Sequence, residues 1–173
     1  MSKTFFIADT HFWHSNVIKY ENRPFMSAEE MNAKLISNWN KVVRSPDRVF
    51  MLGDFALANR QKIAEIVPKL NGHKILIMGN HDQYAPKFYL EAGFDEVSKY
   101  PIILDGFWIL SHEPMYLNEN MPYANIFGHV HGNMAFADFS PQSICVSVER
   151  KHMNYTPIEF NQVKKIMGVD AKK

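Results

Sequence analysis

Side chains that bind divalent metals recur in this sequence directly after short apolar runs. Five times along the chain, an apolar run is followed by Asp, His or Asn. The polar stretches are Asp9-Thr10-His11, Gly53-Asp54, Gly79-Asn80-His81-Asp82, Ser111-His112 and Gly128-His129-Val130-His131. Such a run is typical of a buried strand that ends in a loop, and open α/β sheets place their chemistry in loops at the carboxyl ends of strands. Satisfied core histidines and turn aspartates would explain one or two of these stretches, but not all five.

The residue types favour a site for two divalent metal ions. Two of the aspartates, four of the histidines and the one asparagine in these stretches already offer more ligands than one ion needs. Their mixture of imidazole and oxygen suits Mn²⁺, Fe²⁺ or Zn²⁺ better than Ca²⁺. Because one residue separates Asp9 from His11, both side chains leave an extended backbone on the same side and can reach one ion. Two ions would outweigh the charge of two aspartate ligands, so the site would attract an anion.

In this order, the five stretches resemble the motifs of the calcineurin-like metallophosphoesterase superfamily, and within it the small single-domain prokaryotic and phage-type phosphoesterases. The resemblance runs from residue 9 to residue 131 and misses no motif position. It implies two divalent ions, with Mn²⁺ favoured and Fe²⁺, Zn²⁺ or Ni²⁺ as alternatives. One ion would be held by Asp9, His11, Asp54 and His131, and the other by Asp54, Asn80, His112 and His129. Asp54 would then bridge both ions.

The resemblance also implies a reaction, the hydrolysis of phosphate esters, with phosphodiesters favoured over phosphomonoesters. A hydroxide that bridges the metals would attack phosphorus in line with the leaving oxygen, since two such ions lower the pKa of the bridging water towards roughly 7. His81 would assist the leaving group, and Asp82 would hold the tautomer of His81. His14 and Arg23 follow the first motif and are candidates for contacting phosphate oxygens, with a surface His and a solvated Arg as the alternative.

Residues outside the motifs are weaker candidates. His73 and His152 have no motif partner, and we interpret them as structural. The segment between His112 and the last motif contains Tyr116, Met121 and Tyr123, which either wall the site or belong to the core.

Composition limits the partners and the location that we expect. A chain of 173 residues predicts a single domain over residues 1–173. The net charge of +1 provides no basic stripe, so nucleic acid is not favoured as a partner. Cys145 is the only cysteine, and the sequence has neither a signal peptide nor a membrane span, which favours a cytoplasmic protein. We expect a small phosphate-ester substrate and no membrane partner, whereas the sequence leaves the oligomeric state open.

The first half of the chain alternates between strand and helix. Residues 3–8 and 74–78 are apolar runs that predict buried strands, and residues 28–43 and 61–70 have helical periodicity. Pro68 weakens the last turn of the second helix. This alternation favours crossovers onto a parallel sheet.

The second half changes character. Asp105-Gly106, between the apolar runs 102–104 and 107–110, predicts a tight hairpin and therefore an antiparallel pair. Another strand is expected over residues 143–148. Thr156-Pro157-Ile158-Glu159 has the composition of a helix start, with Thr as cap and Pro at the first helical position. Periodicity thus predicts an α/β fold with a mixed sheet, and the resemblance implies a four-layer α-β-β-α sandwich with two mixed sheets.

Two other functions remain open. One is a non-catalytic metal-binding scaffold or protein-interaction module on the same fold, since the superfamily includes relatives that lost catalytic residues. The presence of His81 and of every metal ligand argues against it. The other is a nuclease or cyclic-nucleotide phosphodiesterase, and the weak charge bias disfavours the nuclease.

Overall fold

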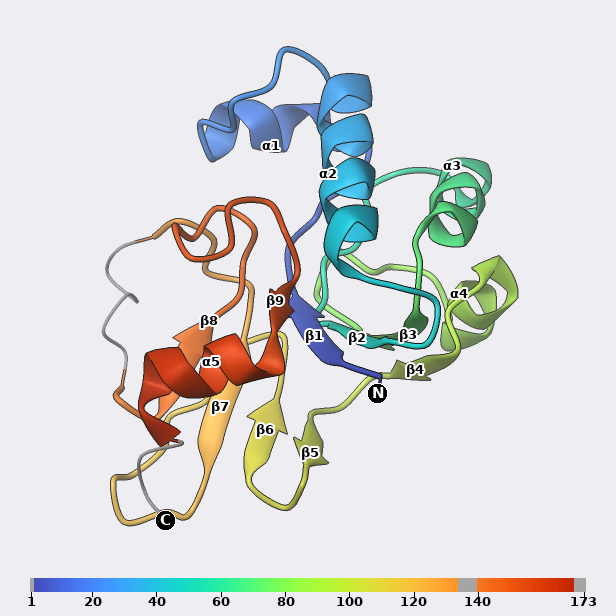
Figure 1. The fold of residues 1–173 in the computed structure, drawn as a ribbon. Coiled ribbons are helices and arrows are strands. Elements are labelled where there is room, and N and C mark those ends of the chain that lie inside the picture. The colour runs from blue at the N-terminus through green and yellow to red at the C-terminus, as the bar shows by residue number, and fades with distance from the viewer. Residues whose placement is uncertain (1, 134–139, 170–173) are drawn as a thin grey trace.

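Two mixed sheets form the centre of the computed structural model, which describes residues 2–133 and 140–169 (Figure 1). The five-stranded sheet has the order β4-β3-β2-β1-β9, and the four-stranded sheet has the order β5-β6-β7-β8. The first sheet contains β1 (Thr4–Ile7), β2 (Arg48–Met51), β3 (His73–Ile77), β4 (Glu96–Ser98) and β9 (Ile158–Glu159). The second contains β5 (Ile102–Leu104), β6 (Trp108–Leu110), β7 (Ala124–Phe127) and β8 (Ser143–Cys145).

Strands β1 to β4 pair in parallel, as the alternation of strand and helix predicted. In the register of the sheet, Phe6 lies beside Phe50, and Phe50 lies beside Ile75. All three side chains are buried. Both faces of this sheet are covered, which explains why its strands are continuous apolar runs rather than alternating ones.

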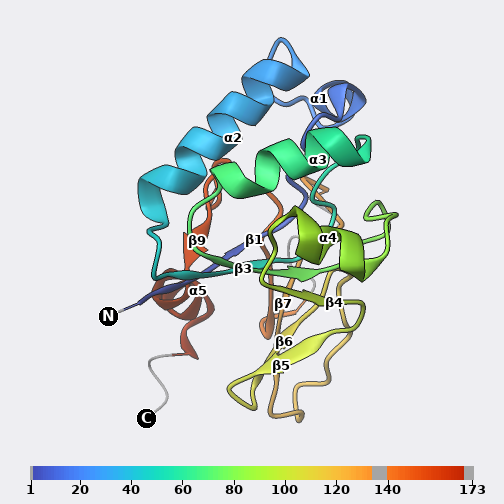
Figure 2. The ribbon, with the colours of Figure 1, turned by 90° about the vertical axis from the view of Figure 1, so that its right-hand side faces the viewer.

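Three helices form the outer layer on one side of the five-stranded sheet, and the second sheet lies on its other side (Figure 2). They are α2 (Ala28–Val42), α3 (Arg60–Ile66) and α4 (Pro86–Ala92). Ser27 caps α2 by accepting a hydrogen bond from the backbone N–H of Glu30 at 3.2 Å. The α-helix of α3 ends at Ile66 and continues as a 3₁₀ turn, η1 (Val67–Lys69), because Pro68 has no N–H to extend the helical ladder.

The second sheet begins with the predicted hairpin. Its turn residues Asp105 and Gly106 have left-handed φ values of 53° and 69°, and the N–H of Phe107 closes the turn by donating to the carbonyl of Leu104 at 3.2 Å. Strands β6, β7 and β8 then pair in parallel. After β8, Ser147 forms a β-bridge with Ala8, the residue that follows β1. The N–H of Ala8 donates to the carbonyl of Val146 at 3.0 Å. The end of β1 is therefore connected to both sheets.

The last helix begins later than predicted. Ile158 and Glu159 form β9, which pairs antiparallel with β1, and α5 (Phe160–Met167) starts only after it. The predicted helix start at Thr156 is therefore wrong, because burying Ile158 against β1 outweighs the local capping pattern. The short helix α1 (Ser15–Tyr20) was not predicted.

Helix α5 supplies the other outer layer, so the four-layer order is confirmed. It contacts β8 and crosses in front of it in Figure 1. Phe160 packs edge-on against Phe6 and Trp108, one from each sheet. Within residues 2–133 and 140–169, none of the helices is both long and apolar enough to cross a bilayer.

Candidate metal centre

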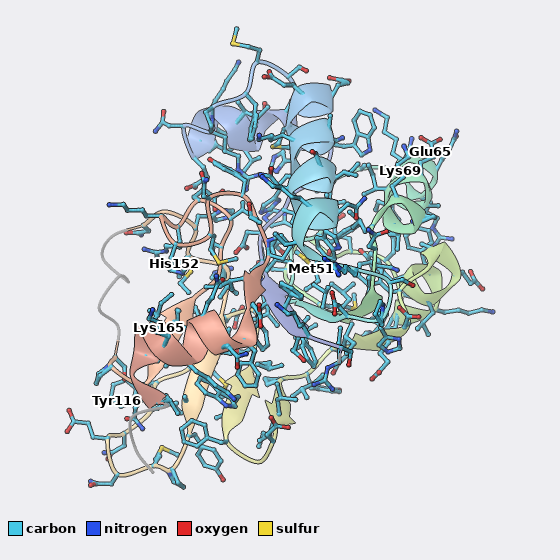
Figure 3. The ribbon with its side chains drawn as sticks, in the orientation of Figure 1. Met51, Glu65, Lys69, Tyr116, His152 and Lys165 are labelled. Carbon is cyan, nitrogen blue, oxygen red and sulfur yellow. The ribbon has the colours of Figure 1, made fainter. Side chains whose placement is uncertain are left out.

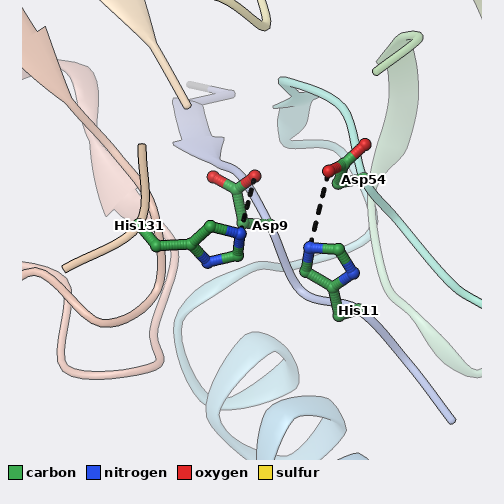
Figure 4. Close-up of side chains that lie close together, drawn as sticks. All are labelled: Asp9, His11, Asp54 and His131. Atoms are coloured by element: carbon green, nitrogen blue, oxygen red, sulfur yellow. Dashed lines mark ion pairs between the residues drawn. The ribbon is translucent and has the colours of Figure 1, made fainter. Parts of the chain in front are cut away.

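The predicted ligands come together where the strands of both sheets end. Asp9 follows β1, Asp54 follows β2, and Asn80 follows β3. Two clusters of close ligand atoms result, one of Asp9, His11, Asp54 and His131 and one of Asp54, His112 and His129. Figure 4 shows the side chains of the first cluster pointing toward one another. Within each cluster the candidate ligand atoms lie within 4.8 Å of one another, close enough to share an ion.

Asp54 belongs to both clusters, and its two carboxylate oxygens face different histidines. Its Oδ2 lies 3.5 Å from Nε2 of His11, and its Oδ1 lies 3.5 Å from Nε2 of His112. The side chain is almost completely buried. A carboxylate in this position can bind one ion with each oxygen, so the geometry fits a bridging ligand.

In the first cluster, the buried Nε2 atom of His11 has no hydrogen-bond partner among the described residues. A buried polar atom without a partner is costly and calls for an explanation. Burial and the nearby positive charge of His131 hold the pKa of His11 well below its ordinary value. The imidazole is therefore neutral, which is the form that binds metals. An ion beside Asp54 would supply the missing partner.

A contact with His14 can set the tautomer of His11. The two Nδ1 atoms lie 3.3 Å apart, so one must donate to the other. If Nδ1 of His11 carries the hydrogen, its Nε2 keeps a free lone pair directed at Asp54. The contact with phosphate and the surface position were the two alternatives for His14, and this contact places its ring where it can orient His11.

The second cluster brings acceptor atoms together. Nδ1 of His112 lies 2.9 Å from the carbonyl oxygen of Leu52 and must donate to it, which leaves Nε2 unprotonated in the neutral ring. That Nε2 lies 3.0 Å from Oδ1 of Asn80 and 3.2 Å from Nδ1 of His129. Nε2 of His112 and Oδ1 of Asn80 are therefore both acceptors, and a cation between them would relieve their repulsion. The donor set therefore fits a divalent ion.

Asp9 is held firmly by its neighbours. Its Oδ2 accepts hydrogen bonds from the hydroxyl of Ser147 at 2.6 Å and from the backbone N–H of His129 at 2.9 Å. Its Oδ1 lies 4.0 Å from Nε2 of His131. Burial raises the pKa of Asp9 to about 6 despite the opposing charge of His131. A metal ion would favour the ionised carboxylate that burial disfavours.

The backbone is strained at five of the candidate ligands. Their φ values are 57° at Asp9, 48° at His11, 55° at Asp54, 67° at His129 and 48° at His131. Left-handed backbone in non-glycine residues costs of order 1–3 kcal/mol each and persists only where the surrounding structure imposes it, often at functional sites. The shared strain indicates that the surrounding fold imposes this backbone conformation, at a cost in stability, and thereby orients these side chains.

A glycine allows the close approach of the two clusters. A Cβ atom on Gly79 would lie 2.3 Å from Oδ1 of Asp54 and 2.8 Å from Cε1 of His112. Neither atom can move without displacing a ligand. A residue with a Cβ atom at position 79 would therefore displace a candidate ligand, which explains the glycine in the third motif.

Arg23 lies elsewhere than predicted, and Glu149 was missed. The guanidinium of Arg23 is buried and binds one carboxylate oxygen of Glu149, with its Nε at 2.8 Å. Its remaining donors reach the carbonyl oxygens of Thr10 at 2.9 Å and Asp9 at 2.6 Å. The expectation that it contacts phosphate is therefore wrong in this structure, because its donors are used inside the protein.

Glu149 extends this contact to the last motif. Its Oε1 lies 3.1 Å from Nδ1 of His131, so it directs Nε2 of that ring toward Asp9. Burial opposes ionisation of both side chains, but their mutual attraction outweighs burial. This attraction raises the pKa of His131 to about 9 and lowers the pKa of Glu149. The sequence signal was present, since Glu149 directly follows the predicted strand 143–148.

His81 stands at the edge of the first cluster. Its ring is half-buried and packs edge-on against the ring of His11, with 5.3 Å between centroids. Its backbone N–H donates to Oδ1 of Asp54 at 2.9 Å. A half-buried imidazole beside the ligands, and not among them, can reach a substrate that lies on the metals.

Contrary to the prediction, Asp82 does not hold the tautomer of His81. Its carboxylate accepts hydrogen bonds from the backbone N–H groups of Asp54 at 2.8 Å, Gly79 at 2.9 Å and Phe55 at 3.1 Å. Burial raises its pKa to about 7 even so. Because it joins the loops after β2 and β3, Asp82 positions the motif backbones instead of the ring.

The weaker candidates lie away from the centre. His73 pairs with Glu96 at 3.1 Å, and Nε2 of His152 lies 2.8 Å from the carbonyl oxygen of Cys145, both structural contacts. Tyr116 is 81% exposed and is labelled with His152 on the left of Figure 3.

Two hollows open beside the clusters. One has a volume of about 370 Å³ and is lined in part by Asn80 and His112. The other has a volume of about 570 Å³ and is lined in part by His129 and His131. The segment Glu113-Pro114 borders both. Neither Met121 nor Tyr123 lines either hollow, nor does Tyr116. The candidate ligands therefore lie between two spaces of small-molecule size.

Comparison with known proteins identifies the fold and its motifs. The family model described as "Calcineurin-like phosphoesterase" matches residues 2–134. The uncharacterized protein MJ1445 of Methanocaldococcus jannaschii is 39% identical over 175 residues, covering 96% of this chain and 92% of that protein. The Gene 66 protein of Mycobacterium phage L5 is 33% identical over 85 residues, covering 47% of this chain and 41% of its own length.

A solved structure supports the same assignment. The crystal structure of AQ665, a protein of unknown function from Aquifex aeolicus, has a TM-score of 0.74 and 29% sequence identity. The match covers 96% of this chain and 100% of that one. The family match spans every motif that supplies a candidate ligand. The chain therefore belongs to the calcineurin-like phosphoesterase family.

Proposed function

We propose that this protein hydrolyses phosphate esters with the help of two divalent metal ions, and that it prefers phosphodiesters to phosphomonoesters. One observation carries the proposal: the two carboxylate oxygens of Asp54 face the Nε2 atoms of His11 and His112 in separate clusters. This arrangement supports two adjacent ions that share one ligand. Paired ions of this kind recur in enzymes that act on phosphate esters.

The first ion would be held by Asp9, His11, Asp54 and His131, and the second by Asp54, Asn80, His112 and His129. Imidazole and oxygen ligands together suit Mn²⁺, which we propose as the metal, with Fe²⁺, Zn²⁺ or Ni²⁺ as alternatives. When bound, such ions supply hydroxide from water near neutral pH and attract the anionic phosphate. We further propose that the protein is cytoplasmic. Its free, buried Cys145 and a small phosphate-ester substrate agree with that location.

His81 is the residue that we assign to the leaving group. Its ring lies beside His11 but is absent from both ligand clusters, so it is free to protonate or stabilise the departing oxygen. The contact with Asp54 through its backbone N–H fixes the loop from which the ring projects. Asp9, Asp54 and the histidines of the two clusters would then bind the metals and orient the substrate, while His81 would move the proton.

The preference for diesters rests on the two hollows. A phosphodiester carries two organic groups, and the candidate ligands lie between two spaces of about 370 and 570 Å³ that each could accept one. A monoester would leave one of them unused. Glu21 and Glu113 line the larger hollow, and their charge disfavours a polyanion such as nucleic acid there.

The decisive experiment compares bis-p-nitrophenyl phosphate with p-nitrophenyl phosphate as substrates of metal-stripped protein, with and without Mn²⁺. We expect turnover that depends on Mn²⁺, is faster for the diester and is lost in His81→Ala. His73→Ala is the matched control, because that histidine pairs with Glu96 far from the clusters. If neither ester were hydrolysed with Mn²⁺, Fe²⁺, Zn²⁺ or Ni²⁺, a metal-binding scaffold or an enzyme with a very narrow natural substrate would replace this proposal.

A further inference from the structure

The smaller hollow has an apolar wall that the metal chemistry does not use. Asn80 and His112 form the side of this 370 Å³ space that borders the second cluster. The same space is also lined by Met78, Tyr100, Pro101, Pro114 and Met115. Ligand sites of this size are lined mainly by apolar and aromatic side chains with a few polar groups at one end. The hollow combines both kinds of residue, and its polar residues include the candidate ligands Asn80 and His112.

Two residues of this wall are large, apolar and exposed. Tyr100 is 75% exposed and Met115 is 37% exposed, although side chains of this kind usually pack inside. Aromatic rings stack on Tyr, and the flexible thioether of Met makes favourable contacts with ring edges. The wall is therefore suited to a planar aromatic group.

The backbone that carries these side chains is fixed in advance. The N–H of Tyr100 donates to Oγ of Ser98 at 3.1 Å, and the hydroxyl of Ser98 donates to the carbonyl of Tyr100 at 2.8 Å. The N–H of Met115 donates to Oδ1 of the buried Asn125 at 2.9 Å. A wall that is already ordered loses little conformational freedom when a ligand binds.

The two hollows differ in charge. Lys99 lines the smaller hollow and balances Glu113, whereas the larger one contains the two carboxylates of Glu21 and Glu113. An electron-rich ring next to a phosphate is therefore placed more favourably in the smaller hollow.

We propose that the hollow between Asn80, His112, Tyr100 and Met115 is a subsite for an aromatic ester group, so that the substrates are phosphate esters with an aryl or nucleoside substituent. This assignment rests on the proposed function, because it takes the phosphate to lie on the metal ligands. The phosphate would be held beside Asn80 and His112, and the ring would lie against Tyr100 and Met115.

The test uses binding instead of turnover. Isothermal titration calorimetry of the Mn²⁺-loaded protein would compare phenylphosphonate with methylphosphonate, two ligands that share a head group and resist hydrolysis. We expect phenylphosphonate to bind about tenfold more tightly, the gain expected from one buried ring. Tyr100→Ala and Met115→Ala should each reduce this ratio and leave the Kd of methylphosphonate unchanged. Tyr116→Ala is the matched control, an exposed tyrosine that does not line the hollow.

The outcomes separate this subsite from the proposed function. Equal affinities for the two phosphonates, or a ratio unaffected by both wall variants, would overturn the subsite and leave the phosphoesterase proposal standing. If neither phosphonate bound the loaded protein, the phosphate site itself would be refuted, and the subsite with it. Retained circular dichroism spectra would show that the exposed substitutions leave the fold intact.

Discussion

Oε1 of Glu149 lies 3.1 Å from Nδ1 of His131 and at the same time binds the guanidinium of Arg23. Arg23 in turn donates to the carbonyl oxygens of Asp9 and Thr10, in the first motif. One buried carboxylate thus joins the first and last motifs, which are more than a hundred residues apart in the chain. We infer that Glu149 positions the ligands of the first ion without touching the ion.

Replacing Glu149 by Gln should weaken the first metal site. The amide can still accept a hydrogen bond from His131, but it lacks the charge that makes the ring a stronger ligand. Loss of such a partner typically lowers metal affinity about 10–100-fold. Titration of the metal-free protein with Mn²⁺ would measure the change, with the exposed Glu65→Gln as control (Figure 3). Unchanged affinity in Glu149→Gln would rule out the positioning role.

A second prediction concerns acid stability away from the metals. Asp47 accepts hydrogen bonds from the backbone N–H groups of Lys3 and Arg44, both at 2.8 Å. Burial raises the pKa of Asp47, but these two bonds outweigh burial and hold the pKa below 3.8. The carboxylate therefore contributes to the free energy of unfolding above pH 3.8, and this contribution is lost as the pH falls through the lower folded pKa.

Asp47→Asn should accordingly be destabilised by about 1–3 kcal/mol at neutral pH, since it loses charged hydrogen bonds. The difference in the free energy of unfolding between this variant and the wild type should shrink as the pH is lowered below 3.8. Urea denaturation of the metal-free proteins would measure both quantities, and Asp105→Asn in the exposed hairpin turn serves as control. A difference that stayed constant with pH would contradict the assignment to Asp47.

Sequence reasoning brought the candidate ligands together because their positions follow from simple regularities. Parallel strands end at one edge of a sheet, so residues such as Asp9, Asp54 and Asn80 must meet once the strands are recognised. The hairpin at Asp105-Gly106 was predicted equally well, because a tight turn depends on its own two residues.

Contacts between distant segments could not be predicted in the same way. The partner of Arg23 is 126 residues away, and no local pattern distinguishes an arginine that binds phosphate from one that binds a buried carboxylate. Asp82 directly follows His81 in the chain, yet its carboxylate accepts hydrogen bonds from three backbone N–H groups and not from the His81 ring. Ile158 joined a sheet edge against its local helix signal for the same reason, since tertiary packing overrides local preference.

Removing the ring of His81 should affect chemistry and leave metal binding intact. The ring belongs to neither ligand cluster, and only its backbone N–H contacts Asp54. His81→Ala should keep its metal content and lose about 10²–10⁴ in kcat, the range for general acid catalysis. Metal analysis beside steady-state kinetics would test both halves. The role would be refuted by normal turnover or by loss of the metals.

Asp54→Asn should have the opposite signature, because the two carboxylate oxygens of Asp54 face different clusters. An amide keeps one oxygen acceptor and replaces the other with an NH₂ group, so it can bind at most one ion well. We expect the bound Mn²⁺ to fall from two ions to one or none per chain, with turnover falling in parallel. Asp95→Asn, at an exposed position beside His73, is the control. If Asp54→Asn still bound two ions with wild-type affinity, the carboxylate would not bridge them, and the arrangement on which the proposed function depends would have to be abandoned.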